Sequence, residues 1–134
     1  MKRIRADLHI HSLLSPCGSL EMSPREIISR AKSKGLDMIA VADHNSTWHC
    51  ELMVSLGQEA GITVLRAAEV TSSEDVHSLV ILQDEASTRS FQHWIDSRCT
   101  YLPHNTALFG DPVIVDSEAQ IIREITHFLP AALN

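Results

Sequence analysis

The segment that most constrains the fold of this chain is residues 36–43, because its sequence (LDMIAVAD) is almost continuously apolar. Such a run is typical of a parallel strand that other layers cover on both faces. It ends at Asp43, and the polar residues His44, Asn45 and Ser46 follow directly. Ligands of parallel α/β sheets bind at the carboxyl ends of the strands. We therefore expect an α/β domain with a site at this edge of its sheet.

One helix is predicted before this strand in the sequence and one after it. The first begins at the sequence Ser23-Pro24-Arg25-Glu26, a capping box in which Ser23 is the N-cap and Pro24 fits the first helical position. It ends at Gly35. The second covers residues 47–60 and ends at Gly61.

Further strands are predicted at residues 5–12, 62–70 and 76–82, with a short helix around residues 91–95. The resulting order is βαβαβ followed by a closely linked strand, which predicts an α/β fold with a mainly parallel sheet. With 134 residues the chain is expected to form one domain, residues 1–134.

The last third of the chain permits two interpretations. Residues 99–112 are rich in turn formers and predict a loop. After it, residues 117–128 could form a capped helix, or residues 113–115 and 120–122 could pair as a hairpin. We favour the hairpin.

Composition and charge exclude several classes of protein. No apolar run approaches the roughly 20 residues of a membrane span, and the basic N-terminus precedes no hydrophobic signal segment. The net charge of −6 argues against general nucleic-acid binding. Cys17, Cys50 and Cys99 are an odd, scattered set that suits reduced thiols, so we expect a cytoplasmic protein.

The first predicted strand carries three ionisable side chains at alternating positions. Asp7, His9 and His11 are expected on one face, with Leu8 and Ile10 on the other. Burying such groups without partners costs several kcal/mol each. A metal ion removes that cost, and imidazole is its commonest side-chain ligand.

Similar side chains recur along the next strands. His44 follows the second strand, Glu69 ends the third and His77 lies on the fourth. Separately, each has an ordinary explanation: a helix cap, a solvated strand end and a hydrogen-bonded core histidine. Together with His9 and His11 they indicate a site for two or three metal ions, with Glu69 as a candidate bridge.

The chain resembles the PHP (polymerase and histidinol phosphatase) domain family in four motifs: Asp7-Leu8-His9-Ile10-His11-Ser12, Ala42-Asp43-His44-Asn45-Ser46, Glu69-Val70-Thr71 and Val76-His77. The resemblance implies part of a distorted barrel of seven βα units, here truncated after about four. Metal ions would lie at the strand ends.

The resemblance also implies a set of ligands. His9 and His11 would bind one metal, Glu69 would bridge to a second held by His77, and His44 would hold a third. The ions would be Mn²⁺, Zn²⁺ or Fe²⁺, because imidazole and carboxylate together select none of them uniquely.

Three further residues have two interpretations each. Many family members have aspartate or histidine where this chain has Cys17, which is either a thiolate ligand or a loop residue. Asp7 and Asp43 would either orient the ligand histidines or cap turns.

The activity implied by the resemblance is hydrolysis of a phosphate ester by a metal-activated water. The substrate would be small and phosphorylated, with nucleotides among the candidates. Two alternatives stay open: an amidohydrolase, although no lysine follows Lys34, and a metal-binding but catalytically silent fragment or assembly module.

The later motifs of the family, a Pro-x-His strand and a terminal Asp-x-His, have no counterpart here. Pro103-His104 has no apolar strand before it, and Thr126-His127 lacks the pattern that should follow. A partial barrel leaves two unpaired edges and an open apolar interior. We therefore expect a homo-oligomer in which two copies cover each other's sheet.

Overall fold

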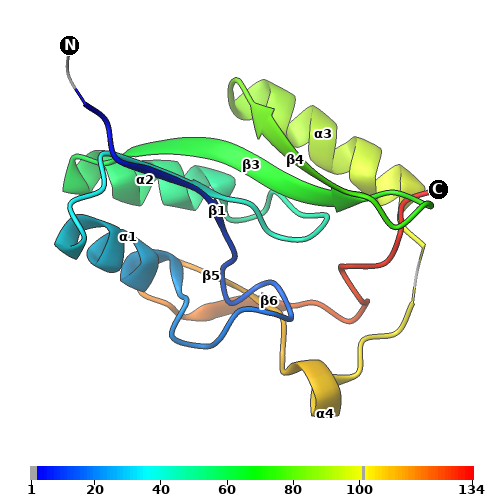
Figure 1. Ribbon diagram of the computed structural model, residues 1–134. Helices are drawn as coiled ribbons and strands as arrows, with labels where there is room; N and C mark the ends of the chain where they lie inside the picture. The colour runs from blue at the N-terminus through cyan, green and yellow to red at the C-terminus, as the bar shows by residue number, and fades with distance from the viewer. Residues whose placement is uncertain (1–2, 101) are drawn as a thin grey trace.

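A four-stranded sheet with the strand order β1-β2-β3-β4 forms the centre of the protein. The computed structural model describes residues 3–100 and 102–134, so Met1, Lys2 and Tyr101, which falls in the loop expected at residues 99–112, lie outside the described residues. The strands are β1 (Ala6–Ile10), β2 (Met38–Val41), β3 (Thr63–Thr71) and β4 (His77–Leu82). The first three are parallel and β4 runs antiparallel to β3, which confirms the mainly parallel α/β sheet (Figure 1).

Three of the described helices follow the predicted order: α1 (Pro24–Ser33), α2 (Cys50–Ala60) and α3 (Glu85–Arg98). The prediction of a short helix around residues 91–95 is too short, because the Asp84 side chain caps α3 by accepting from the Ser87 N–H and starts the helix earlier. The short α4 (Thr106–Phe109) lies within the stretch predicted as a loop. The Ser23 side chain accepts from the backbone N–H of Glu26, as expected of the N-cap. In a full capping box the Glu26 carboxylate would accept from the Ser23 backbone N–H. Here it accepts from Arg30 instead (3.0 Å). None of the described helices has the length and apolar character needed to cross a membrane.

The start of α2 was predicted three residues too early. Thr47 does not enter the helix because its backbone N–H and its hydroxyl both donate to the Gln92 side chain on α3, at 2.7 and 2.9 Å. The predicted end is correct: Gly61 adopts a left-handed conformation with φ 75°.

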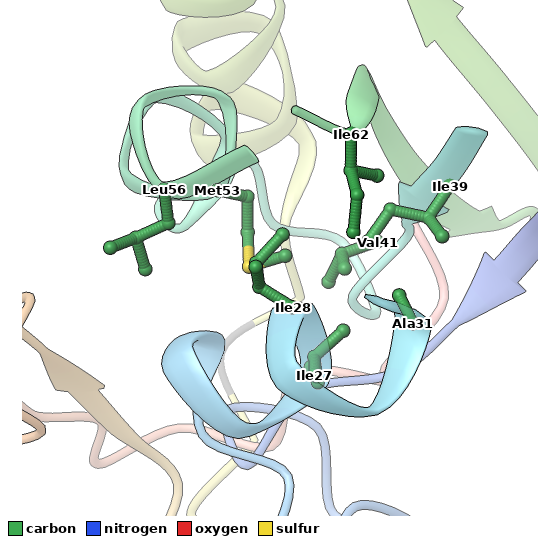
Figure 2. Close-up of a cluster of buried hydrophobic side chains, with 8 residues drawn as sticks. All are labelled: Ile27, Ile28, Ala31, Ile39, Val41, Met53, Leu56 and Ile62. Atoms are coloured by element: carbon green, nitrogen blue, oxygen red, sulfur yellow. The ribbon is translucent and has the colours of Figure 1, made fainter. Parts of the chain in front are cut away.

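The main hydrophobic core lies between the sheet and the helices α1 and α2. Figure 2 shows its eight buried residues: Ile27, Ile28, Ala31, Ile39, Val41, Met53, Leu56 and Ile62. These side chains come from α1, β2, α2 and the residue before β3, so the apolar segment at residues 36–43 supplies one wall of the core. This packing fixes β2 and thereby the position of the polar residues that follow it.

A bulge in β1 changes which face its side chains share. Asp7 pairs with Ile39 and Ile10 pairs with Val41, so three steps along β1 match two along β2. As a result Leu8 packs against the small residues of β2 and β3, whereas Ile10 packs against the core at α1 and α2. The expectation that Leu8 and Ile10 lie on the same face is wrong.

The last third of the chain forms the predicted hairpin. The strands β5 (Val113–Val115) and β6 (Ile121–Glu124) pair antiparallel in a separate two-stranded sheet. The Asp116 carboxylate closes the turn by accepting from the backbone N–H groups of Glu118 and Gln120 (both 2.9 Å). A side chain that holds the backbone in a turn competes with helix formation, and here the turn prevails.

Candidate metal centre

Four histidines surround one glutamate at the carboxyl edge of the parallel strands. His9 and His11 come from β1 and the residues after it, His44 follows β2, and Glu69 lies near the end of β3. Because β4 is antiparallel to β3, its first residue, His77, lies at this same edge. The sheet therefore brings together the five residues that were predicted as ligands on or directly after the strands.

The Glu69 carboxylate is the centre of this group. Its Oε2 atom lies 3.1 Å from His9 Nε2, 3.1 Å from His11 Nε2 and 3.5 Å from His44 Nδ1. Its Oε1 atom accepts from His77 Nδ1 at 2.9 Å. Glu69 is only 6% exposed. Burial alone would raise its pKa, but hydrogen bonds from His9 and His77 and the nearby imidazoles lower it, so the carboxylate stays ionised.

The proton positions on His11 follow from the hydrogen bonds of Ser15. The Ser15 hydroxyl donates its one proton to Asp43 (2.7 Å), so it must accept from His11 Nδ1, 3.2 Å away. The proton of a neutral His11 ring is therefore on Nδ1. Burial is the main cause of the lowered pKa of His11, which favours this neutral ring.

The consequence is that a lone pair on His11 Nε2 faces the Glu69 carboxylate at 3.1 Å. Two acceptors at this distance repel each other unless a cation lies between them.

His44 offers a second free nitrogen to the same centre. Its Nδ1 atom is buried and has no hydrogen-bond partner among the described residues. The pKa of His44 is lowered, first by burial and then by His11. A buried nitrogen without a hydrogen bond destabilises the folded protein, and coordination of a cation removes this penalty.

The possible ligand atoms form three overlapping sets, each with all atoms within 4.8 Å of one another. The sets are His9, His11 and Glu69; His44, Glu69 and His77; and His11, Cys17 and His44. Imidazole, carboxylate and thiolate groups at this spacing fit divalent transition metals. The described residues thus form a cluster that could hold metal ions, the candidate metal-binding cluster, and it includes every one of the six predicted ligands.

Asp43 lies beside the cluster and is fully hydrogen-bonded. It accepts from the Ser12 backbone N–H, the Ser12 hydroxyl and the Ser15 hydroxyl, all at 2.7 Å. Burial would raise the pKa of Asp43, but the contacts with His49, Ser12 and Ser15 outweigh it and hold the pKa below its usual value. Asp43 therefore acts on the candidate ligand His11 through Ser15 rather than directly.

The hydrogen-bond chain continues away from the cluster to the hairpin. The backbone N–H of Val115 donates to His49 Nε2 (3.1 Å), so the proton of the neutral ring lies on Nδ1, which contacts the Ser12 hydroxyl (2.9 Å). Sequence reasoning missed Ser12, Ser15 and His49. Serines in loops carry no distinctive spacing, and His49 lay within a predicted helix.

Asp7 lies apart from the cluster. Its carboxylate accepts from the backbone N–H of His9 (3.3 Å), and it lines a hollow with Ile10 and Met22 on the α1 side. Among the described residues it makes no hydrogen bond to a histidine ring. The bulge in β1 accounts for this position, because it separates the face of Asp7 from that of the two histidines.

Comparison with known proteins covers most of the chain. The model of the PHP domain family matches residues 7–109. Uncharacterized protein MJ1587 of Methanocaldococcus jannaschii is 34% identical over 80 residues, a match that covers 53% of this chain and 46% of that protein.

Two solved structures are similar in fold. A candidate metal-dependent phosphoesterase from Bifidobacterium adolescentis is 27% identical with a TM-score of 0.59, over 72% of this chain and 34% of that chain. An amidohydrolase from Chromobacterium violaceum, solved with sulfate and without metal, is 27% identical with a TM-score of 0.60, over 69% of this chain and 32% of that chain. The chain thus spans about half the length of the curated relative and about a third of each solved structure.

Proposed function

The chain belongs to the PHP domain family, and from this premise we propose that it takes part in metal-dependent hydrolysis of a phosphate ester. The observation that carries the proposal is the pair of imidazole nitrogens, on His11 and His44, that face the ionised Glu69 carboxylate without a hydrogen bond. Divalent ions, when bound, would activate water and neutralise charge on the phosphate.

The geometry of Glu69 suggests how the ligands would divide among bound ions. The Oε2 atom faces His9 and His11, whereas Oε1 faces His77, so the carboxylate is suited to bridge two ions. His44 and Cys17 would hold a third. Asp43 would keep the His11 proton on Nδ1 through Ser15, which leaves Nε2 free to bind. Asp7 would position the backbone of His9.

The substrate is proposed to be small and phosphorylated, with nucleotides among the candidates. The six ligands include no lysine or arginine, so the positive charge that attracts a phosphate comes from the ions. The name of the phosphoesterase relative supports a phosphate ester. The three described cysteines are free, which agrees with the cytoplasmic location we propose.

The proposal is tested by metal content and hydrolysis measured on the same samples. We expect protein loaded with Mn²⁺, Zn²⁺ or Fe²⁺ to hydrolyse p-nitrophenyl phosphate, and Glu69→Gln to lose both metal and activity. Glu74→Gln, an exposed glutamate in the turn after β3, serves as the matched control and should retain both. Bound metal without turnover would instead support the silent module, and turnover of an amide but not of the phosphate would support an amidohydrolase.

A further inference from the structure

The candidate metal-binding cluster has two chemically different ends. At one end Glu69 contributes the only carboxylate among the three ligand sets, and at the other Cys17 contributes the only sulfur. Carboxylate oxygen is a hard ligand that suits Mn²⁺, whereas thiolate sulfur is a soft ligand that suits Zn²⁺. The two ends therefore differ in the cations that they favour.

The loop that carries Cys17 is held in a fixed shape. Two successive turns join it to the site, with Ser15 N–H donating to Ser12 (3.1 Å) and Gly18 N–H donating to Ser15 (2.8 Å). A Cβ atom at Gly18 would lie 2.0 Å from the Ser12 carbonyl oxygen, so only glycine allows this close approach. The loop holds the Cys17 sulfur 3.6 Å from His44 Nε2.

His44 lies between the two ends and faces each with a different nitrogen. Its Nε2 atom is directed to Cys17 and its Nδ1 atom lies 3.5 Å from Glu69 Oε2. A neutral imidazole has one lone pair, so it binds an ion at one end and presents an N–H to the other.

We propose that Cys17 makes its end of the cluster selective for a thiolate-preferring cation such as Zn²⁺, whereas the Glu69 end also accepts Mn²⁺. The ligands at the selective end are Cys17 and His44, whose Nε2 atom then carries the lone pair, because the lone pair of His11 faces Glu69 at the other end. On binding, the thiol releases its proton to solvent as the sulfur–metal bond forms. This inference rests on the proposed metal site and deepens it.

The test is titration of the metal-free, reduced protein with Co²⁺, which substitutes for Zn²⁺ and absorbs light. Co²⁺ at any of the sets gives visible bands, but only thiolate ligation gives a sulfur-to-cobalt charge-transfer band in the near ultraviolet. We expect this band to saturate at one Co²⁺ per chain and to be abolished in Cys17→Ser. Cys99→Ser is the matched control, because Cys99 is a partly exposed free thiol outside the cluster, and it should keep the band.

A second variant converts the selectivity without removing a ligand. In Cys17→Asp a hard carboxylate replaces the soft thiolate, so the number of bound ions should stay the same. The ratio of Zn²⁺ to Mn²⁺ affinity at that end should fall by about tenfold or more. Circular dichroism of each variant establishes that the fold is intact.

The outcomes separate this inference from the proposed function. Visible cobalt bands without the charge-transfer band, or a charge-transfer band that survives in Cys17→Ser, would overturn the role of Cys17 and leave the Glu69 site standing. An absence of all cobalt bands would overturn both proposals.

Discussion

The Ser15 hydroxyl determines which nitrogen of the His11 ring carries the proton and which faces the cluster with a lone pair. It has one proton, which goes to Asp43, and it therefore fixes the proton of His11 on Nδ1 (3.2 Å). The nitrogen that faces Glu69 is left with a lone pair. Hydrogen bonds of this kind, one shell away from the ion, orient a ligand and adjust its basicity.

The role of Ser15 is tested by Ser15→Ala. The variant frees the His11 ring to adopt the other tautomer and leaves the buried Asp43 with one donor fewer. We expect metal affinity, measured by isothermal titration calorimetry, to fall by about 10- to 100-fold. Ser73→Ala, in the exposed turn after β3, should change it by less than about twofold. An unchanged affinity in Ser15→Ala would show that the tautomer of His11 is not set by this contact.

The titration of the Cys50 thiol makes the free energy of unfolding depend on pH. Burial raises the pKa of this thiol from 9.0 to about 12, and the thiol donates to the Ala67 carbonyl. Because the folded pKa is the higher one, the unfolded chain loses the proton first as the pH rises above 9. Stability is therefore complete below pH 9 and decreases between 9 and 12 by up to about 1.4 kcal/mol per pH unit.

The measurement is urea unfolding of the metal-free protein at pH 8 and pH 10. The wild type should lose more stability over this interval than Cys50→Ala. Burial also raises the pKa of Cys99, but the thiol is less buried than Cys50, so Cys99→Ala should reduce the loss by less than Cys50→Ala does. An equal loss in all three proteins would contradict the assignment to Cys50.

Single elements show which parts of the structure the sequence determines. The apolar run at residues 36–43, the N-cap Ser23 and the stop at Gly61 each act locally, and each was predicted correctly. The bulge in β1 was not, because it depends on the register of β1 against β2. The residues that gather in the candidate cluster were predictable because imidazole and carboxylate groups at strand ends are uncommon. Their supporting residues Ser12, Ser15 and His49 were not, because common polar residues acquire that role only in the folded chain.

The hydrogen bonds of His49 link the hairpin to the candidate metal-binding cluster, and a single substitution can remove them. His49→Ala would leave the Val115 N–H without its acceptor and remove one hydrogen bond of the buried Ser12 hydroxyl, which still donates to Asp43. We expect a loss of about 2–3 kcal/mol in the free energy of unfolding and faster hydrogen exchange of the Val115 amide.

The control for this variant is His93→Ala, an exposed histidine on α3, which should cost less than about 0.5 kcal/mol. Unchanged exchange at Val115 in His49→Ala would mean that the hairpin is held by its apolar contacts alone.

At the scale of the whole molecule, the described sheet has two outer strands, β1 and β4. Leu79 and Ile81 on β4 are 41% and 51% exposed. They pair with Glu69 and Ala67 on β3, so they share the face of the sheet that carries the site. Exposed apolar side chains on an outer strand favour association, which is the reason we propose a homo-oligomer.

Sedimentation tests this association. Ile81→Lys should shift the protein toward the monomer at micromolar concentration, since it places a charge on the apolar face. Ile121→Lys, at a somewhat more exposed position on β6, should not. A wild-type protein that sediments as a monomer under these conditions would contradict the proposal.

The proposed metal centre places a cation between the imidazoles and the Glu69 carboxylate. Anomalous diffraction from crystals grown with Zn²⁺ or Mn²⁺ tests it most directly. We expect an anomalous peak at about 2.0–2.2 Å from both His11 Nε2 and a Glu69 oxygen. Fully occupied peaks found only elsewhere on the protein, with the cluster empty, would contradict it.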